Sequence, residues 1–484
     1  MCGIIGYLGK QKVVPILING LQKLEYRGYD SVGLCVVGPC GLQVIKKKGK
    51  VSEFAEEIKA KPLDGSIGIA HTRWATHGEP NEVNAHPHLD CQGSIAIVHN
   101  GIIENYRALK ELLIKEGHRI ISETDSEIIA HLVEKFYQGD LEKAVIETLK
   151  LVEGAYGLAI IHKNENRMIV ARKGSPLVIG LGQEEMFVAS DVSAILNHTR
   201  QVIYLQDNEI AVLTKDSYEI KNLNGDILNK EIHEVQWTID QIEKGNFKHF
   251  MLKEIFEQPE AIANSLRGRI KDGKIKVTLD LEVKDIKRLI IVACGTSWHA
   301  SLIGKYLIEK INRLPTEVDY ASEFRYRHPI LKDGDVLIAV SQSGETADTL
   351  AAIKEAKEQG IKTMGIVNAV GSTIAREVDS GIYIHAGPEI GVASTKAFTG
   401  QVMALILLAL FIQQEKGQLA PADFLQELAA LPNKIAEVLK QSGEIRQLAE
   451  KFQKSGNFLY LGRGINFPVA LEGALKLKEI SYIH

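Results

Sequence analysis

The pattern of apolar residues changes near residue 284, and this change constrains the fold more than any other feature of the sequence. From Cys2 to about Leu213, short apolar runs such as GSIGIAHT and SIAIVHN alternate with turn residues, which is typical of antiparallel strands. Beyond residue 284, continuous aliphatic strands alternate with helices, as in RLIIVACGTSWHASLIGKYLIEK, which indicates a parallel sheet covered on both faces. We therefore predict an α+β domain followed by a doubly wound α/β domain.

The chain length agrees with several domains, because 484 residues exceed what one hydrophobic core usually organises. The boundaries follow changes in composition and helical or strand pattern. We expect an N-terminal domain at 2–215, a polar linker at 216–283, a first α/β domain at 284–424, a helical connection at 425–456 and the start of a second α/β domain at 457–484. The last helical segment has no Gly or Asn stop signal, so we expect the second α/β domain to be truncated.

Charge and composition exclude several classes of protein. Lys and Arg number 57 and Asp and Glu 61, so the net charge of -4 provides no basic surface for nucleic acid. The five cysteines form no CxxC pair, which fits a reducing compartment. No signal peptide is visible, and the longest apolar run, VMALILLALFI at 402–412, is too short to cross a bilayer. We expect a cytoplasmic protein that binds neither nucleic acid nor membrane.

Cys2 stands directly behind the initiator methionine. If Met1 is removed, Cys2 carries its own α-amine, whose pKa of about 8 makes it a base beside the thiol nucleophile. The strand SIAIVHN ends in Asn100 and Gly101, whose side-chain amide and backbone N–H can form an oxyanion hole. Two other interpretations remain: a structural buried cysteine, and a hairpin turn at Asn-Gly.

A second candidate site lies in LIAVSQSGETADTL, where a strand runs into Ser341, Gln342, Ser343 and Thr346 and then into a helix. Hydroxyls and backbone N–H groups at a helix N-terminus favour an anion. No GxxxxGK[ST] pattern occurs, so a sugar phosphate is favoured over a nucleoside triphosphate. CGTSWH follows the preceding strand in the same way. Simple helix capping by the serines is the alternative.

Together, CGIIGY, LEYRGYDSVGL, GIAHTRWATHGEPNEVNAHPH, VHNGIIENY and SETDSE resemble class II glutamine amidotransferases of the N-terminal nucleophile type. With ACGTS, SQSGETADTL and EIGVASTKAFT, the resemblance narrows to the isomerising glutamine:fructose-6-phosphate aminotransferases and covers nearly all of the chain. It implies an αββα sandwich followed by parallel-sheet sugar isomerase (SIS) domains. It also implies the conversion of glutamine and fructose 6-phosphate to glutamate and glucosamine 6-phosphate in amino sugar biosynthesis, without a cofactor and in a homodimer.

For the first domain, the resemblance implies that the Cys2 thiol forms a glutamyl thioester and releases ammonia. The other matched positions are the oxyanion-hole residues Asn100 and Gly101, the α-carboxylate partner Arg73, the α-ammonium partner Asp125, the ammonia gate Trp74, and the pocket residues Thr76 and His77. From the residues alone, Arg73 and Asp125 could also be surface charges of little energetic value.

For the second half, the resemblance implies a sugar-phosphate site. Its matched positions are Cys294, Gly295, Thr296, Ser297, Ser341, Gln342, Ser343, Thr346, Val392, Ser394 and Lys476. Glu479 matches the carboxylate that moves a proton between C1 and C2 of the sugar, and it shares a helix face with Lys476. A solvated Glu and Lys face would have the same sequence.

The resemblance also implies a ring-opening histidine and a Schiff-base lysine, both at positions beyond His484. We therefore expect this chain to retain only the glutaminase half-reaction. Histidines 71, 77, 86, 88 and 99 lack HxxxH or Cys/His ligand spacing, so we expect no metal.

Two alternative functions share parts of the pattern. Asparagine synthetase and the phosphoribosyl-pyrophosphate amidotransferase share the Cys2 domain but need a nucleotide or pyrophosphate site, which the hydroxyl-rich loops disfavour. SIS-containing transcriptional regulators need a helix-turn-helix and a basic face, which the net charge disfavours.

Overall fold

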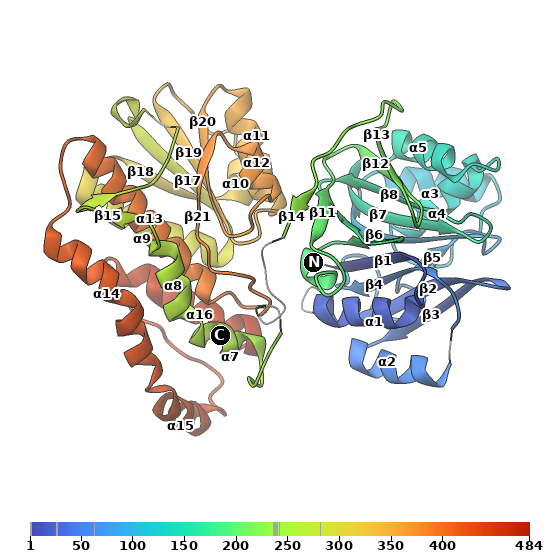
Figure 1. The fold of residues 1–484 in the computed structure, drawn as a ribbon, viewed down its shortest axis with the longest axis horizontal. Coiled ribbons are helices and arrows are strands. Elements are labelled where there is room, and N and C mark those ends of the chain that lie inside the picture. Colours follow the sequence, from blue (N-terminus) through green and yellow to red (C-terminus); the bar gives the residue numbers. More distant parts are fainter. Residues whose placement is uncertain (1, 26–27, 62, 236–240, 242, 281) are drawn as a thin grey trace. The chain divides into compact units, whose positions relative to one another are not determined.

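Two antiparallel sheets form the first of two units, residues 1–239 (Figure 1). The computed structural model describes every residue except 1, 26–27, 62, 236–240, 242 and 281. The first sheet has the order β14 (His233–Glu234), β11 (Gln201–Tyr204), β9 (Val178–Leu181), β10 (Glu185–Ala189), β1 (Gly3–Gly9), β4 (Ile67–Arg73), β2 (Ser31–Gly38), β3 (Gly41–Lys48). The second has the order β13 (Tyr218–Asn222), β12 (Glu209–Leu213), β8 (Met168–Lys173), β7 (Gly154–His162), β6 (Ile95–Ile103), β5 (His88–Leu89).

The two sheets pack face to face, and helices cover the outer face of each. Ile4 and Leu8 of β1 belong to the core between the sheets, together with Val98 of β6. Ile5 points the other way, towards Gly20 of a helix. Neighbouring strands run in opposite directions. Along each central strand, apolar and polar side chains do not alternate, because both faces of the sheet are covered. The result is the expected αββα sandwich.

The helices of this unit fall into two groups. Helices α1 (Val13–Leu24) and α2 (Val51–Ala60) cover the first sheet, and α3 (Tyr106–Lys115), α4 (Glu127–Phe136) and α5 (Leu141–Leu151) cover the second. Helix α5 begins where the Asp140 carboxylate accepts a hydrogen bond from Glu142 N at 3.1 Å, a standard N-cap. Helix α4 begins directly after Asp125 and Ser126, so its packing against β6 positions those two side chains.

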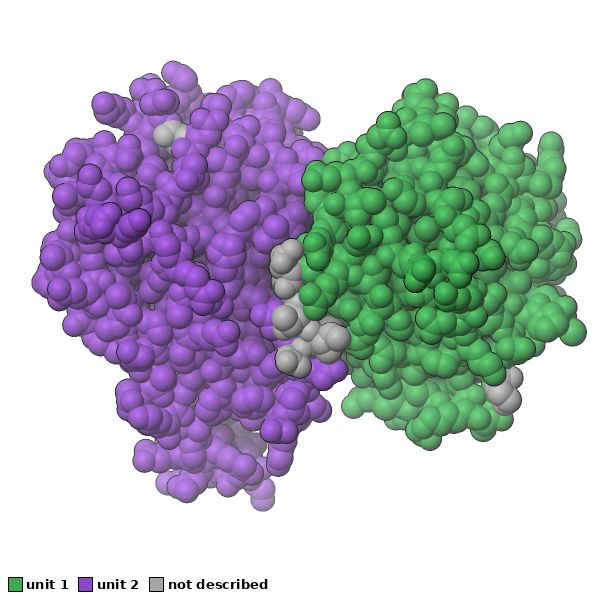
Figure 2. All heavy atoms as spheres, viewed as in Figure 1, with its two compact units in different colours: residues 1–239 green, residues 240–484 purple. Residues whose placement is uncertain are grey.

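A five-stranded parallel sheet forms the centre of the second unit, residues 240–484, which Figure 2 shows in purple. Its order is β18 (Thr316–Tyr320), β17 (Arg288–Ala293), β19 (Asp335–Ser341), β20 (Lys362–Val367), β21 (Ser380–Tyr383). The strand order reverses between β17 and β19, and ligands of such sheets bind outside the carboxyl ends of the strands at that switch point. The hydroxyl-rich loops after β17 and β19 lie there.

Helices cover both faces of the parallel sheet, as the sequence predicts. One core contains residues of α9 (Gly295–Asn312) and α13 (Lys396–Glu415), and the other contains residues of α10 (Ala321–Tyr326), α11 (Ala347–Glu358) and α12 (Thr373–Glu377). By length and composition α13 could cross a membrane, but most of it is buried in the core of this unit.

Much of the segment 216–283, expected to be a linker, belongs to the two units. Strand β13 pairs with β12 in the second sheet of the first unit. Helices α7 (Phe250–Phe256) and α8 (Gln258–Leu266), the two-stranded β15 (Ile270–Lys271) and β16 (Lys274–Ile275), and the 3-10 turn at Val283–Asp285 belong to the second unit. Ile262 joins the core of that unit, and the Ser265 hydroxyl donates to the carbonyl of Ile384. The polar composition reflects the exposed faces of these short elements.

The C-terminal segment is helical: α14 (Ala422–Leu439), α15 (Ser442–Phe452) and α16 (Asn466–Ser481). Residues 457–463, where the expected second α/β domain should begin with a strand, form no strand, and no strand of the described residues pairs with them. Leu459 and Leu461 are about nine-tenths exposed there, at 91% and 89%. Helix α16 packs against α9 and brings Glu472 and Lys476 to the start of that helix.

Candidate functional site

Cys2 lies immediately before β1, beside the end of β4, because Gly3 pairs with Thr72. Its thiol is half-buried and interacts with the backbone of Trp74. Sγ accepts from Trp74 N at 3.3 Å and donates to Trp74 O at 3.5 Å. Burial raises the pKa of the Cys2 thiol, and the hydrogen bond from Trp74 offsets only part of that rise. A nucleophile at this position therefore needs a base. Met1, whose removal would create that base, lies outside the described residues.

Asn100 lies next to Cys2, across from β1 on the second sheet. Its Nδ2 donates to the carbonyl oxygen of Cys2 at 3.0 Å, and its Oδ1 lies 3.0 Å from Nε2 of His71. A side-chain amide oxygen only accepts, so His71 Nε2 carries the proton and donates. Burial lowers the pKa of His71 to about 3, so the ring is neutral. His71 therefore fixes which way the Asn100 amide points.

The Asn-Gly pair forms no hairpin turn, since both residues belong to β6, where Asn100 pairs with Gly157 of β7. Gly101 has φ +138°, and a Cβ there would lie 2.0 Å from the Ala155 carbonyl oxygen. Only glycine fits this backbone. The strand thus presents the side-chain amide of Asn100 beside the Cys2 thiol without a turn.

Arg73 is the last residue of β4 and is buried. Its guanidinium donates to the carbonyls of His77, Gly78 and Glu79, with lengths of 3.2 Å to Gly78 and 3.3 Å to Glu79. The loop after β4 therefore folds around this cation. Arg73 is a buried group that organises the loop beside Cys2, and it is no surface charge.

Asp125 is also buried and faces the same loop. Its Oδ2 accepts from Ile103 N at 2.8 Å, and its Oδ1 lies 4.0 Å from Nδ1 of His77. Nδ1 of His77 also lies 3.3 Å from the Thr76 hydroxyl. The loop residues 76–77 thus connect the surroundings of Arg73 with those of Asp125, and the structure brings the predicted residues of this site together.

Trp74 is 42% exposed and meets the Tyr29 ring edge-on, with ring centroids 5.2 Å apart. Sequence reasoning missed Asp30, whose carboxylate accepts from Ala75 N and from the Ser31 hydroxyl and so holds the loop after β4. It also missed the supporting role of His71. Asp30 lies within the segment LEYRGYDSVGL, but nothing in its spacing indicates which backbone group it holds.

In the second unit, the loop between β19 and α11 is closed by its own hydroxyls. The Ser341 hydroxyl lies 2.9 Å from that of Thr346 and accepts from Gly344 N at 3.0 Å, while the Ser343 hydroxyl accepts from Glu345 N at 3.2 Å. Thr346 directly precedes α11 without a side-chain capping bond. The hydroxyls therefore shape a loop at the N-terminus of α11, the arrangement that favours an anion. Gln342 belongs to this loop, and its carbonyl accepts from Asn368 N.

The first turns of α9 meet α16. The Thr296 hydroxyl donates to Glu472 Oε1 at 2.9 Å and accepts from Lys476 Nζ at 2.8 Å. Lys476 also contacts Glu479, at 2.5 Å. The other Glu472 oxygen lies 2.7 Å from Nδ1 of His299. Lys476 therefore belongs to a polar cluster, whereas Glu479 contacts Lys476 from the exposed side of the helix. Sequence reasoning missed Glu472 and His299, although Glu472 lies four residues before Lys476 and shares its helix face.

The other residues predicted for the sugar site lie further apart from one another. Cys294 and Gly295 begin α9, and burial raises the pKa of the Cys294 thiol. The Ser297 hydroxyl accepts from Gln401 of α13 at 2.9 Å. Ser394 donates to Glu389 at 2.7 Å, and Val392 is exposed; both follow β21, at the opposite edge of the sheet from β18. The structure therefore does not bring these two residues into the hydrogen-bonded loop at 341–346, as far as the described residues go.

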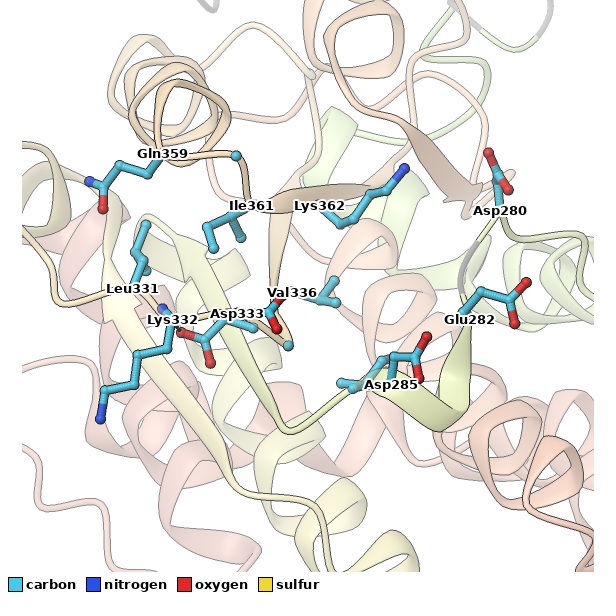
Figure 3. Close-up of a pocket in the computed structure, with 14 residues that line it drawn as sticks. Asp280, Glu282, Asp285, Leu331, Lys332, Asp333, Val336, Gln359, Ile361 and Lys362 are labelled. Atoms are coloured by element: carbon cyan, nitrogen blue, oxygen red, sulfur yellow. Dashed lines mark hydrogen bonds between the residues drawn. The ribbon is translucent and has the colours of Figure 1, made fainter.

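A cavity of about 400 Å³ lies at the other end of the parallel sheet (Figure 3). Its lining includes Asp285, Lys332, Asp333 and Lys362, which precede or begin β17, β19 and β20. The cavity is therefore at the amino ends of the strands, and the hydroxyl-rich loops are at the carboxyl ends. The hydroxyls and helix N-terminal N–H groups that favour an anion converge at the carboxyl ends.

Comparisons with known proteins match both units. The family model for a glutamine amidotransferase domain matches residues 71–197, and the model for a SIS domain matches residues 282–411. An isomerising glutamine–fructose-6-phosphate aminotransferase of Chlorobaculum tepidum is 54% identical over 100% of this chain and 81% of its own length. That of Bacteroides thetaiotaomicron is 52% identical with the same coverage. The solved C-terminal domain of a glucosamine-fructose-6-phosphate aminotransferase from Francisella tularensis is 43% identical, covering 50% of this chain and 70% of that one, with a TM-score of 0.46.

These relatives overturn the prediction that the chain retains only the glutaminase half-reaction. Proteins named for the complete aminotransferase reaction match all of this chain. The prediction was wrong because it rested on residues expected beyond His484 and not on the similarity along the chain itself.

Proposed function

The chain belongs to the family of isomerising glutamine–fructose-6-phosphate aminotransferases, and we propose that Cys2, freed of Met1, is the nucleophile that hydrolyses its glutamine. The observation that carries this proposal is the 3.0 Å hydrogen bond from Asn100 Nδ2 to the Cys2 carbonyl, which places an amide donor beside the thiol. The neutral His71 ring orients that donor.

The chemistry follows from these groups. The α-amine of Cys2 takes the thiol proton, and Sγ attacks the side-chain carbonyl carbon of glutamine. The carbonyl oxygen becomes an oxyanion, which the Asn100 amide and the Gly101 N–H stabilise. The C–N bond breaks, ammonia leaves with the proton from the α-amine, and a glutamyl thioester remains. Water then attacks the thioester and releases glutamate and the thiol.

Arg73 and Asp125 orient the substrate in this proposal. A guanidinium fork matches an α-carboxylate, and a buried carboxylate matches an α-ammonium group. Both side chains are buried beside the loop that follows β4, next to Cys2, and this position supports the assignment. Thr76 and His77 line the pocket between them, and the exposed Trp74 covers its entrance as the gate for ammonia.

In the second unit, we assign the phosphate of fructose 6-phosphate to the loop at 341–346 and the sugar to the cluster around Thr296. The hydroxyls of Ser341, Ser343 and Thr346 and the N-terminus of α11 favour an anion. Glu479 is the carboxylate that moves a proton between C1 and C2, and Lys476 Nζ lies 2.5 Å from it. The remaining sugar contacts in this proposal are Cys294, Gly295, Ser297 and Gln342. Val392 and Ser394 follow β21, outside the hydrogen-bonded loop at 341–346. We further propose a cytoplasmic homodimer that needs no cofactor.

The test treats the purified protein with a glutamine-mimicking electrophile and then measures the mass of the N-terminal peptide. The expected product lacks Met1 and carries the label on Cys2 Sγ. The Cys2→Ala variant should not be labelled, and its rate of glutamate release should fall by about 10³-fold or more. Cys40→Ala, which removes an exposed cysteine from the turn between β2 and β3, is the matched control and should match wild type. Full activity in protein that retains Met1 would overturn the proposal.

A further inference from the structure

Four metal-ligating side chains meet in the first unit, outside the proposed glutamine site. Cys91 belongs to the turn between β5 and β6, His118 follows α3, and His131 and Glu134 lie three residues apart on α4. Their ligand atoms all lie within 4.8 Å of one another. Three separate parts of the chain thus supply one thiol, two imidazoles and one carboxylate. Neither His118 nor His131 is among the histidines that the sequence analysis considered for a metal.

The spacing of these atoms fits one tetrahedral ion. Cys91 Sγ lies 3.7 Å from Nδ1 of His118 and 3.4 Å from Nδ1 of His131. Glu134 Oε2 lies 3.1 Å from Nδ1 of His118 and 3.6 Å from Nδ1 of His131. Zinc bonds of about 2.3 Å to sulfur and about 2.1 Å to nitrogen or oxygen separate tetrahedral ligands by about 3.4 to 3.6 Å. The four measured separations lie close to those values.

Neighbouring groups resemble the outer partners of metal ligands. Glu127 Oε1 lies 3.5 Å from Nε2 of His131, which is the ring nitrogen that faces away from the cluster. A carboxylate near the outer ring nitrogen is a common feature of histidines that bind a metal. The backbone N–H of Arg119 lies 3.4 Å from Cys91 Sγ and donates to it, as N–H groups often do to metal-bound sulfur.

We propose that Cys91, His118, His131 and Glu134 bind one zinc ion. Four protein ligands and no open position are typical of structural zinc sites, and sulfur with nitrogen ligands favours zinc over magnesium or calcium. The ion would join the turn before β6 to α4 and to the segment before it. Helix α4 begins two residues after Asp125, so zinc would stabilise the wall of the glutamine pocket without taking part in the chemistry.

The first test measures metal content in full-length protein purified without chelator. One zinc per chain is expected in wild type and in Cys40→Ser, and less than a tenth of that in Cys91→Ser. Cys40 is a matched control because it is also an exposed cysteine of the first unit, in a different turn. Full zinc content in Cys91→Ser would overturn the proposal.

The second test starts from the wild-type protein. Chelator-stripped wild type is titrated with Co²⁺, and a thiolate-to-cobalt charge-transfer band with the strong visible bands of tetrahedral cobalt should saturate at one equivalent. Added zinc should remove these bands and raise the thermal midpoint. Cys2→Ala should keep the bands, which separates this site from the nucleophile and lets one proposal fail while the other stands. Absence of the bands in wild type, or their loss in Cys2→Ala, would overturn the zinc site.

Discussion

His71 shows how one buried side chain can control a neighbouring reactive group. Its ring has no charge, because burial lowers its pKa to about 3, and it stacks on His86 with ring centroids 4.2 Å apart. Its Nε2 donates to the side-chain oxygen of Asn100. We therefore treat it as a positioning residue: it acts on the oxyanion through the Asn100 amide and does not touch substrate.

Replacing this donor tests the positioning role. His71→Phe keeps a flat ring but leaves Asn100 Oδ1 without its donor, so kcat for glutamine hydrolysis should fall by about 10- to 100-fold with little change in KM. His71→Gln retains an N–H donor at the end of the side chain and should recover part of the loss. Steady-state glutamate release gives both constants. Equal losses in the two variants, or a change confined to KM, would contradict the positioning role.

At the scale of elements, the turn from β19 into α11 depends on one glycine. Gly344 has φ +66°, and a Cβ there would lie 2.0 Å from the Ser372 hydroxyl oxygen. Ser372 precedes α12, so the loop that we assign to phosphate is packed against a neighbouring helix. The loop therefore has little freedom to relax around a larger residue.

Gly344→Ala should raise KM for fructose 6-phosphate at least about tenfold, since the loop hydroxyls must shift to admit the methyl group. Gly360→Ala is the matched control: Gly360 has φ +75°, but a Cβ there would meet no atom within 4 Å. It should cost only about 1 kcal/mol of stability from backbone strain. Sugar-phosphate titrations and denaturation of both variants make the comparison. Similar effects of the two substitutions would show that strain alone, and not the loop shape, explains Gly344.

At the scale of the whole molecule, two units with separate hydrophobic cores contain the two sites that we propose. Cys2 and Lys476 belong to different units. Lys476→Met removes the cation beside Thr296, Glu472 and Glu479, so glucosamine 6-phosphate formation should fall by at least about 100-fold. Glutamine hydrolysis measured without sugar phosphate should stay within about twofold of wild type. A parallel loss of both activities would contradict the assignment of Lys476 to the sugar chemistry alone.

The order of the apolar runs was enough to predict the two classes of sheet, because short runs separated by turns indicate antiparallel strands and runs separated by helices indicate parallel ones. The αββα sandwich itself followed from resemblance, as did most of the site residues. The short elements between 216 and 283 were not predicted, since two-residue strands and single-turn helices have too few residues to show a period. The strand expected at 457–463 does not form, although its apolar run is long enough to show a pattern. Such a run forms a strand only when a neighbouring strand pairs with it.

The sequence by itself determined which residues can do chemistry: a thiol at position 2, an Asn-Gly pair and hydroxyl-rich segments after two aliphatic strands. Only the tertiary structure decided which of them meet. Asn100 and Gly101 belong to a strand because they pair with β7. Glu472 of α16 contacts Thr296, which lies 176 residues earlier in the chain. Cys91 reached His131 from 40 residues away. Such contacts depend on sheet order and helix packing, which no local spacing of residues encodes.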